Sequence, residues 1–252
     1  MTYCRFEYNG SSQFGWIETI AGHEQITRTL TFPPDKNAPE SGAKKIPHIP
    51  LDEATLLAPV EPSKIVCVGR NYREHAAELG HEVPAEPLIF LKPPSAIIGP
   101  GQIIVRPKIS ARVDHEGELG VVIGKTCRNL KVDEDVRPYI LGYTCVNDVT
   151  ASGELNENPD FAQWCRSKGH DTFGCIGPVI ATELDWLQAR VITRLDGVER
   201  QNYPLTDMIM APVQLVSLLS RDMSLLPGDV IACGTSLGVG SMKDGCIVEV
   251  EI

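Results

Sequence analysis

VDHEGELGVVIG, residues 113–124, is the stretch on which the fold prediction depends. Its second half is apolar and β-branched at both odd and even positions, which is typical of a strand buried on both faces. Side chains two apart on a strand leave the same face, so we expect Glu116 and Glu118 to point the same way. The alternative is an edge strand whose two glutamates face solvent, and the Glu-x-Glu spacing alone favours neither.

A third acid, Asp148, lies in a similar strand-like run at residues 142–150. Carboxylates held together away from water repel each other and lose hydration, unless one is protonated or a cation lies between them. Three carboxylates from two strands suit a hard divalent ion such as Mg²⁺, with positions left open for water and substrate. The sequence therefore predicts a candidate metal site at Glu116, Glu118 and Asp148.

The overall composition is that of an ordinary globular protein. A length of 252 residues suffices for one large domain, or one domain with a small appendage. A net charge of -10 argues against a nucleic-acid-binding surface. No signal peptide or membrane-spanning run is visible, and the eight cysteines lack Cys-x-x-Cys spacing. These features predict a cytoplasmic protein with reduced thiols and with neither a membrane nor a nucleic-acid partner.

Prolines divide the chain into two parts. They are dense between residues 33 and 62, and proline sustains neither central strands nor helix interiors. We interpret this passage as an irregular connection. It predicts a small N-terminal module at residues 1–60, built of short strands, followed by a main domain at residues 61–252.

The main domain opens with a strand at residues 64–69 and a short helix directly after it. Asn71 and Glu74 have the form of a capping box, which predicts where this helix begins. His75 and Glu78 are three residues apart on the helix, so the carboxylate can orient the imidazole. The functional interpretation makes His75 a general base. The alternative is an exposed histidine beside an exposed glutamate.

Later segments add further elements and two candidate groups. The pattern predicts strands at residues 87–94 and 103–105, a hairpin after residues 189–195 and a helix at 213–219. Lys168 lies in an expected glycine-bounded loop, where its ammonium could be solvated or could stabilise an oxyanion. A glycine-rich loop at residues 234–240 lacks the Gly-Lys-Ser/Thr ending of a nucleotide site. Its backbone and Thr235 could hold a carboxylate, or it could be a tight turn without a ligand.

Six separated motifs, in this order and spacing, resemble the fumarylacetoacetate hydrolase family. The resemblance covers about residues 62–252 and is carried by the following pieces: Val66-Cys67-Val68-Gly69-Arg70-Asn71-Tyr72 with His75 and Glu78; Pro87-Leu88-Ile89-Phe90-Leu91-Lys92-Pro93; His115-Glu116-x-Glu118-Leu119; Asn147-Asp148-Val149-Thr150-Ala151; Lys168-Gly169-x-Asp171-Thr172-Phe173; and Pro227-Gly228-Asp229-Val230 ahead of Gly234-Thr235-x-x-Gly238-Val239-Gly240.

The resemblance implies a mainly β fold with α+β character, a mixed β-roll with few helices, usually as a homodimer that binds Mg²⁺ or Mn²⁺. Family members act on 2-oxo or enolisable carboxylic acids by hydrolytic C–C cleavage, decarboxylation or keto-enol isomerisation. The ion chelates the substrate carboxylate and 2-oxo oxygen and stabilises the enolate. Matched residue by residue, the roles implied here are: metal ligands Glu116, Glu118 and Asp148; base His75, oriented by Glu78; oxyanion or enolate stabiliser Lys168; and substrate contacts Arg70, Tyr72, Gly234 and Thr235.

This sequence departs from the family pattern after Ala151. The family usually continues Arg-Asp-x-Gln, and the glutamine helps to arrange the attacking water, whereas here Leu155 takes its place. An apolar side chain cannot hold a water, which favours decarboxylation or isomerisation over hydrolysis.

Three functions therefore remain open from the sequence. The leading expectation is metal-dependent hydrolytic C–C cleavage of an acylpyruvate-like diketo acid. The alternatives are an isomerase or decarboxylase of a 2-oxo dioic acid in aromatic catabolism, and a non-catalytic metal- or ligand-binding β domain. The intact His75, Glu78 and Lys168 argue against the last, because a binding module has no need of a base.

Overall fold

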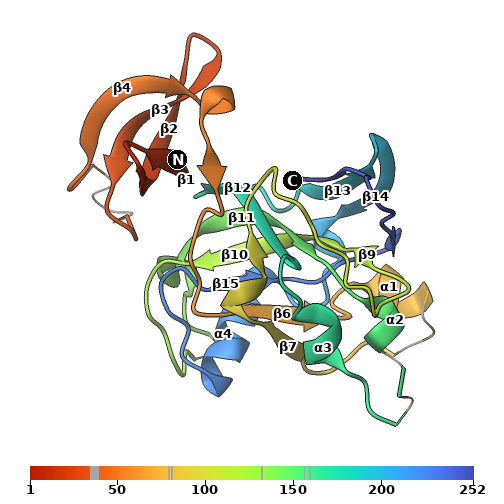
Figure 1. Cartoon of the computed structure of the whole chain (residues 1–252). Helices are drawn as coiled ribbons and strands as arrows, with labels where there is room; N and C mark the ends of the chain where they lie inside the picture. The colour runs from red at the N-terminus through yellow and green to blue at the C-terminus, as the bar shows by residue number, and fades with distance from the viewer. Residues whose placement is uncertain (35–39, 79, 81, 132, 156, 159) are drawn as a thin grey trace.

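Strands are the main regular structure of the chain, and the short helices lie around them (Figure 1). The computed structural model describes residues 1–34, 40–78, 80, 82–131, 133–155, 157–158 and 160–252. The strands are β1 (Thr2–Tyr8), β2 (Ser11–Ile20), β3 (His23–Leu30), β4 (Lys44–Pro50), β5 (Leu56–Leu57), β6 (Ile65–Gly69), β7 (Leu88–Lys92), β8 (Ile97–Ile98), β9 (Asp114–His115), β10 (Gly117–Ile123), β11 (Ile140–Asp148), β12 (Gly174–Ala181), β13 (Arg190–Leu195), β14 (Val198–Pro204), β15 (Val230–Ala232), β16 (Gly240–Ser241) and β17 (Val248–Glu251). The helices are α1 (Arg73–Glu78), α2 (Ser152–Leu155), α3 (Trp164–Lys168) and α4 (Pro212–Asp222), with 3₁₀ turns at Leu51–Glu53, Pro94–Ala96, Arg137–Tyr139 and Leu205–Asp207.

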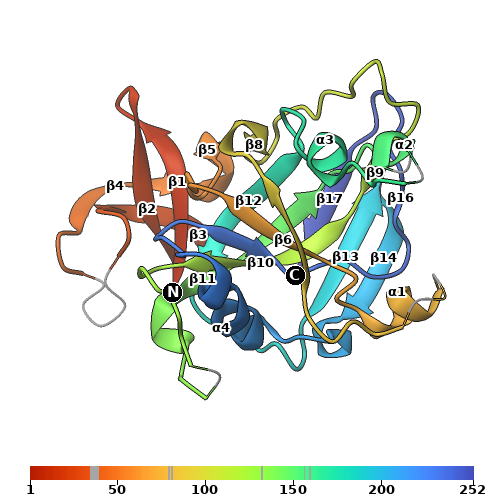
Figure 2. The ribbon, with the colours of Figure 1, turned by 90° about the horizontal axis from the view of Figure 1, so that it is seen from below.

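One large mixed sheet organises these strands. Its order is β4-β3-β2-β1-β12-β11-β10-β15-β6-β7, with β5 beside β1 and β8 beside β12. The pairs β15–β6 and β12–β8 are parallel, whereas the neighbours of β10 are antiparallel to it. A smaller sheet, β14-β13-β17, and the pair β16–β9 complete the roll (Figure 2). The predicted mixed β-roll with a small N-terminal module is confirmed.

The N-terminal strands β1 to β4 form an antiparallel meander that continues the main sheet. β1 pairs with β12 through Thr2↔Ala181 and Tyr3↔Ile180. The prediction of an irregular proline-rich connection is wrong for Lys44–Pro50, because β4 pairs with β3 there. Proline is tolerated in this strand because β4 is at the sheet edge, where no further ladder bond is needed. Pro39 lies outside the described residues.

β10 is buried along its whole length, as predicted. It pairs with β11 on one side and with β15 on the other. Leu119, Val121 and Ile123 pack in a cluster with α4, while Val122 packs in a second cluster on the other face. A strand covered on both faces and both edges holds its polar side chains firmly, which matters for the glutamates at its start.

Three other predictions have mixed outcomes. The hairpin after residues 189–195 is confirmed as β13–β14, and the expected helix is α4, which begins at Pro212. The strand predicted at residues 103–105 is wrong. Ile103 and Val105 are exposed in an extended loop without a strand partner in the described part of the chain.

The capping box predicted for α1 is also wrong. Asn71 is buried, and its side chain donates to the Met210 and Cys233 carbonyls and accepts from the Met210 N–H. The Asp207 carboxylate instead accepts from the Glu74 N–H, at 3.1 Å. Tertiary contacts have replaced the local cap, and they anchor the start of α1 to two distant loops.

No helix within the described ranges combines the length and the apolar character needed to cross a bilayer. All eight cysteines are free thiols, in agreement with the sequence.

Candidate metal centre

Three carboxylates meet at the junction of β10 and β11. Glu116 lies just before β10, Glu118 lies within it and Asp148 ends β11. One oxygen of each lies within 4.8 Å of an oxygen of each of the others. The Asp148 N–H donates to the Glu116 carbonyl at 2.9 Å, so the strand register itself places Asp148 beside the glutamates. The expected convergence of these side chains is present, and their role as metal ligands stays a prediction.

Two buried lysines contact this cluster from one side. Lys168 Nζ donates to Glu116 Oε2 at 2.8 Å and to Asp148 Oδ2 at 2.7 Å. Lys92 Nζ lies 2.7 Å from Asp148 Oδ1 and also donates to the carbonyls of Val149 and Lys168. Lys92 therefore holds Asp148 and the end of α3 together. No local pattern in the sequence around Lys92 indicates this role.

Lys168 is the last residue of α3 rather than part of the expected loop. Burial lowers the pKa of its ammonium, but the carboxylates of Asp148 and Glu116 outweigh burial, so the net shift is upward. Burial likewise raises the pKa of Asp148, and Lys168 and Lys92 more than reverse that effect. Lys168 thus stays protonated and supplies a fixed positive charge rather than a base.

Glu118 makes no ion pair with Lys92 or Lys168 in the described part of the chain, so any negative charge on it has no lysine partner. Its side chain is buried, and Oε2 accepts a 2.7 Å hydrogen bond from the Gly234 N–H. Burial, followed by the charges of Asp148 and Glu116, raises its pKa well above the usual value. A divalent cation among the three carboxylates would offset this charge, and a donor set of carboxylate oxygens suits Mg²⁺ or Mn²⁺. The residues therefore fit the implied metal.

A cavity of about 280 Å³ opens over the carboxylate cluster. Its lining includes most of the predicted site residues together with an apolar end, and consists of Val68, Gly69, Arg70, His75, Phe90, Glu116, Glu118, Asp148, Leu155, Trp164, Lys168 and Thr235. Phe90 and Trp164 stack with their ring centroids 5.2 Å apart. The Lys168 ammonium lies 4.9 Å from the centroid of the Phe90 ring, so the aromatic pair adjoins the charged groups of the cavity.

His75 reaches this cavity from α1, with Nδ1 3.5 Å from Glu78 Oε2. Glu78 itself is exposed and does not line the cavity, so it can act only through His75. Arg70 lines the cavity from a backbone with φ of 56°, a left-handed conformation that is costly for a residue other than glycine.

The structure does not support a substrate contact for Tyr72. Its ring is fully buried and packs edge-on against Tyr203, with centroids 4.8 Å apart, and it is not among the lining residues. Apolar neighbours on β10 and α4 surround it, so it belongs to the core. The Gly234 N–H is also engaged, by Glu118, whereas Thr235 lines the cavity.

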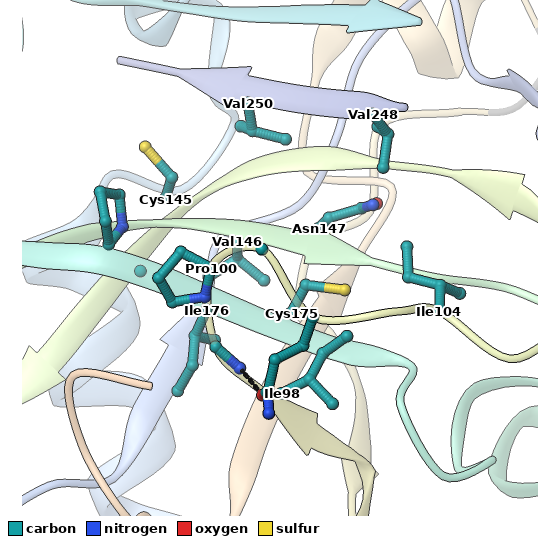
Figure 3. Close-up of a pocket in the computed structure, with 15 residues that line it drawn as sticks. Ile98, Pro100, Ile104, Cys145, Val146, Asn147, Cys175, Ile176, Val248 and Val250 are labelled. Carbon is teal, nitrogen blue, oxygen red and sulfur yellow. Dashed lines mark hydrogen bonds between the residues drawn. The ribbon is translucent and has the colours of Figure 1, made fainter. Parts of the chain in front are cut away.

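A second cavity, of about 210 Å³, lies elsewhere on the sheet (Figure 3). Side chains such as Ile98, Ile176, Val248 and Val250 make it largely apolar. Carboxylates, lysines and histidines are absent from its described lining. The cavity over β10 holds the three converging carboxylates together with Lys168 and His75, and it is the candidate functional site.

Replacing Lys92 should destabilise the fold strongly. In Lys92→Met the buried Asp148 loses one of two cations, and two buried carbonyls lose a donor. Removing one partner of a buried ion pair typically costs about 3–5 kcal/mol, so we expect a fall of about 3 kcal/mol in the free energy of unfolding by urea titration. Arg137→Met, which removes an exposed ion pair with Asp135, is the control and should change little. Equal effects of the two substitutions would contradict this account.

The fumarylacetoacetate hydrolase C-terminal family model matches residues 64–252, with the acidic cluster inside the match. The chain belongs to the fumarylacetoacetate hydrolase family. Residues 1–59 match a separate family model, Rv2993c-like, N-terminal. Family members are enzymes, so this chain has the fold of an enzyme with a candidate metal site.

Three relatives show the range of activities in the family. The solved 2-hydroxyhepta-2,4-diene-1,7-dioate isomerase of Mycobacterium marinum is 35% identical with a TM-score of 0.85, covering 100% of this chain and 93% of the other. Mitochondrial oxaloacetate tautomerase FAHD2A of Bos taurus is 38% identical over 206 residues, 80% of this chain and 65% of that protein. Maleylpyruvate hydrolase of Sphingobium sp. SYK-6, solved with manganese and pyruvate, is 28% identical with a TM-score of 0.77, covering 100% and 94%.

Proposed function

We propose that this protein is a divalent-metal-dependent enzyme that interconverts the keto and enol forms, or double-bond isomers, of a 2-oxo carboxylic acid. The observation that carries the proposal is one cavity that holds three converging carboxylates, a fixed ammonium and a histidine. Mg²⁺ or Mn²⁺, held by Glu116, Glu118 and Asp148, would supply Lewis-acid stabilisation of the charge that develops on the 2-oxo oxygen.

The chain's own residues would complete this chemistry. Lys168 stays charged beside the carboxylates, so its ammonium stabilises negative charge on the enolising substrate. His75, on the cavity wall, takes a proton from the carbon next to the 2-oxo group and delivers it to the 2-oxo oxygen in enolisation, or to a different carbon of the conjugated chain in double-bond isomerisation. Proton transfer and charge stabilisation are all that tautomerisation requires.

Leu155 favours isomerisation over hydrolysis. It lines the cavity at the position where the family usually has a water-arranging glutamine, and its side chain has no hydrogen-bonding atom. Two relatives at 35% and 38% identity are named as an isomerase and a tautomerase, which supports the same choice.

Hydrolytic C–C cleavage of an acylpyruvate-like substrate is the second candidate. It is favoured by the His75–Glu78 pair, because a paired histidine can activate water for attack on the distal carbonyl. It needs another group to position that water in place of Leu155.

Product identification would separate these functions. We would incubate the protein with oxaloacetate, acetylpyruvate and fumarylpyruvate, with Mg²⁺ or Mn²⁺ and then with EDTA, and follow products by NMR. The proposal expects keto-enol exchange or isomerisation that EDTA abolishes. Pyruvate as the main product of the diketo acids would favour hydrolysis, and loss of CO₂ from oxaloacetate would favour decarboxylation. Tight metal binding without turnover of any substrate would favour a non-catalytic domain.

Leu155→Gln should increase hydrolysis. The new amide can hold a water in the cavity, and one such hydrogen bond in the transition state corresponds to about tenfold in rate. We expect about tenfold faster pyruvate release from acetylpyruvate, measured by a coupled assay. Leu155→Met, which fills the same space without a polar group, should give no gain. A gain in both variants would show that cavity shape, rather than water binding, limits hydrolysis.

We also propose a cytoplasmic homodimer, on the basis of the composition and of the family resemblance. Light scattering in solution would test the dimer.

A further inference from the structure

Gln201 is a buried glutamine of β14 that connects β10 to the glycine-rich loop after β15. Its Oε1 accepts from the Gly117 N–H at 2.9 Å. Its Nε2 donates to Thr235 Oγ1 at 2.8 Å and to the carbonyls of Ser236 and Leu237 at 3.2 and 3.3 Å. An N–H can only donate and a carbonyl can only accept, so these partners fix the orientation of the amide.

The same amide fixes the direction of the Thr235 hydroxyl. Because Nε2 donates to Oγ1, the single hydroxyl proton must point to another acceptor. That acceptor is the Gly117 carbonyl, 3.0 Å away. The hydroxyl of Tyr203 donates to the same carbonyl. The Gly117 carbonyl, between the two site glutamates, thus accepts two side-chain hydroxyls.

We propose that Gln201 and Tyr203 are positioning residues that let Thr235 turn its proton from Gly117 to the carboxylate of a bound 2-oxo acid. This inference rests on the proposed function. When the proton turns, the Gly117 carbonyl keeps Tyr203 as a donor, and Oγ1 keeps the Gln201 amide. No buried polar atom is left unpaired, so the exchange avoids the desolvation cost of an orphaned group. Thr235 is 7% exposed and lines the cavity, which places its hydroxyl within reach of a ligand.

The proposal predicts that Tyr203 and Thr235 act as a unit. In Tyr203→Phe the Thr235 hydroxyl is the remaining side-chain donor to the Gly117 carbonyl. Turning the Thr235 proton to the ligand then leaves this buried carbonyl without a side-chain donor. We expect about tenfold weaker binding of a carboxylate ligand, the scale of one hydrogen bond. Thr235→Val removes the proton and should have a similar effect. The double variant should bind no more weakly than Thr235→Val, whereas independent effects would multiply to about a hundredfold.

The experiment titrates oxalate into the Mn²⁺-loaded protein by calorimetry. Oxalate is a planar dianion that resembles the enolate of a 2-oxo acid. The affinity for Mn²⁺ is measured first for every variant and should not change. Thr235→Ser keeps a hydroxyl and should retain wild-type oxalate affinity. Tyr139→Phe, which removes a phenol that donates to Glu134 at the surface, is the matched control and should have no effect.

The outcomes separate this inference from the function on which it rests. Failure of the wild-type protein to bind Mn²⁺ would contradict the proposed function. Two results would overturn the inference alone, provided that Mn²⁺ binding is normal. One is an unchanged oxalate affinity in Tyr203→Phe. The other is a double variant whose loss of oxalate affinity equals the product of the two single losses. If Tyr203→Phe does not fold, Gln201→Met serves in the same cycle, because it removes, without adding a charge, the amide that holds Thr235 Oγ1 in place. It should weaken oxalate binding about tenfold with Thr235 present and not at all with Thr235→Val.

Discussion

Glu118→Gln should abolish tight Mn²⁺ binding and, with it, turnover. Glutamine keeps an oxygen that can accept the Gly234 N–H, so the loop contact survives while the charge is removed. Loss of an outer-shell partner already costs about 10–100-fold in metal affinity, and we expect the loss of this carboxylate to exceed 100-fold. The affinity is measured by calorimetry or by the electron paramagnetic resonance signal of free Mn²⁺.

Stability without metal provides the internal check on this variant. Glu118 is buried beside two other carboxylates, and their charges raise its pKa, so its ionised form is costly in the folded protein. We therefore expect metal-free Glu118→Gln to unfold at a temperature no lower than that of the wild type. Mn²⁺ at 100 times its dissociation constant should stabilise only the wild type, by about 2.7 kcal/mol. Glu183→Gln, at an exposed position, should respond as the wild type does. Wild-type Mn²⁺ affinity in Glu118→Gln would contradict the site.

The carboxylate cluster could be predicted because its geometry is nearly local. Glu116 and Glu118 share a face through the two-residue period of a strand, and the apolar run after them marks the strand as buried. Placing Asp148 required non-local information, because its position beside Glu116 depends on the register between β10 and β11. The strand-like run around Asp148 suggested this placement and the family resemblance supported it, but the hydrophobic pattern alone does not give the register.

Lys92 was missed because the pattern of β7 is misleading. Ile89 and Leu91 are apolar, yet both are exposed, while Phe90 and Lys92 point inward. Residues 88–91 are all apolar, so no alternation assigns Lys92 to a face, and only the distant Asp148 makes its burial favourable. The same limitation explains the wrong capping prediction for Asn71. Its side chain donates to the carbonyls of Met210 and Cys233 instead of capping the helix. Interactions between distant segments determine where these polar side chains lie, and such interactions produce no periodic pattern in the sequence.

His75→Ala should slow turnover by about 10²–10⁴-fold, the usual contribution of a positioned acid or base. The measurement is kcat with the substrate that the product screen identifies, at saturating Mn²⁺. Mn²⁺ and oxalate affinities should stay at wild-type values, because His75 contacts neither the carboxylate cluster nor Thr235 by a hydrogen bond or ion pair within the described residues. His23→Ala, at an exposed position on β3, is the control and should leave kcat unchanged.

Glu78→Gln distinguishes a base from a structural histidine. The Glu78 carboxylate is 57% exposed and lies 3.5 Å from Nδ1, so its pairing with His75 is screened by water and contributes little. We expect Glu78→Gln to lower kcat by less than about tenfold, the limit set by an exposed ion pair of at most about 1 kcal/mol. A large loss for His75→Ala with a small one for Glu78→Gln places the proton transfer on the imidazole itself. Wild-type kcat in His75→Ala would show that His75 is not the base.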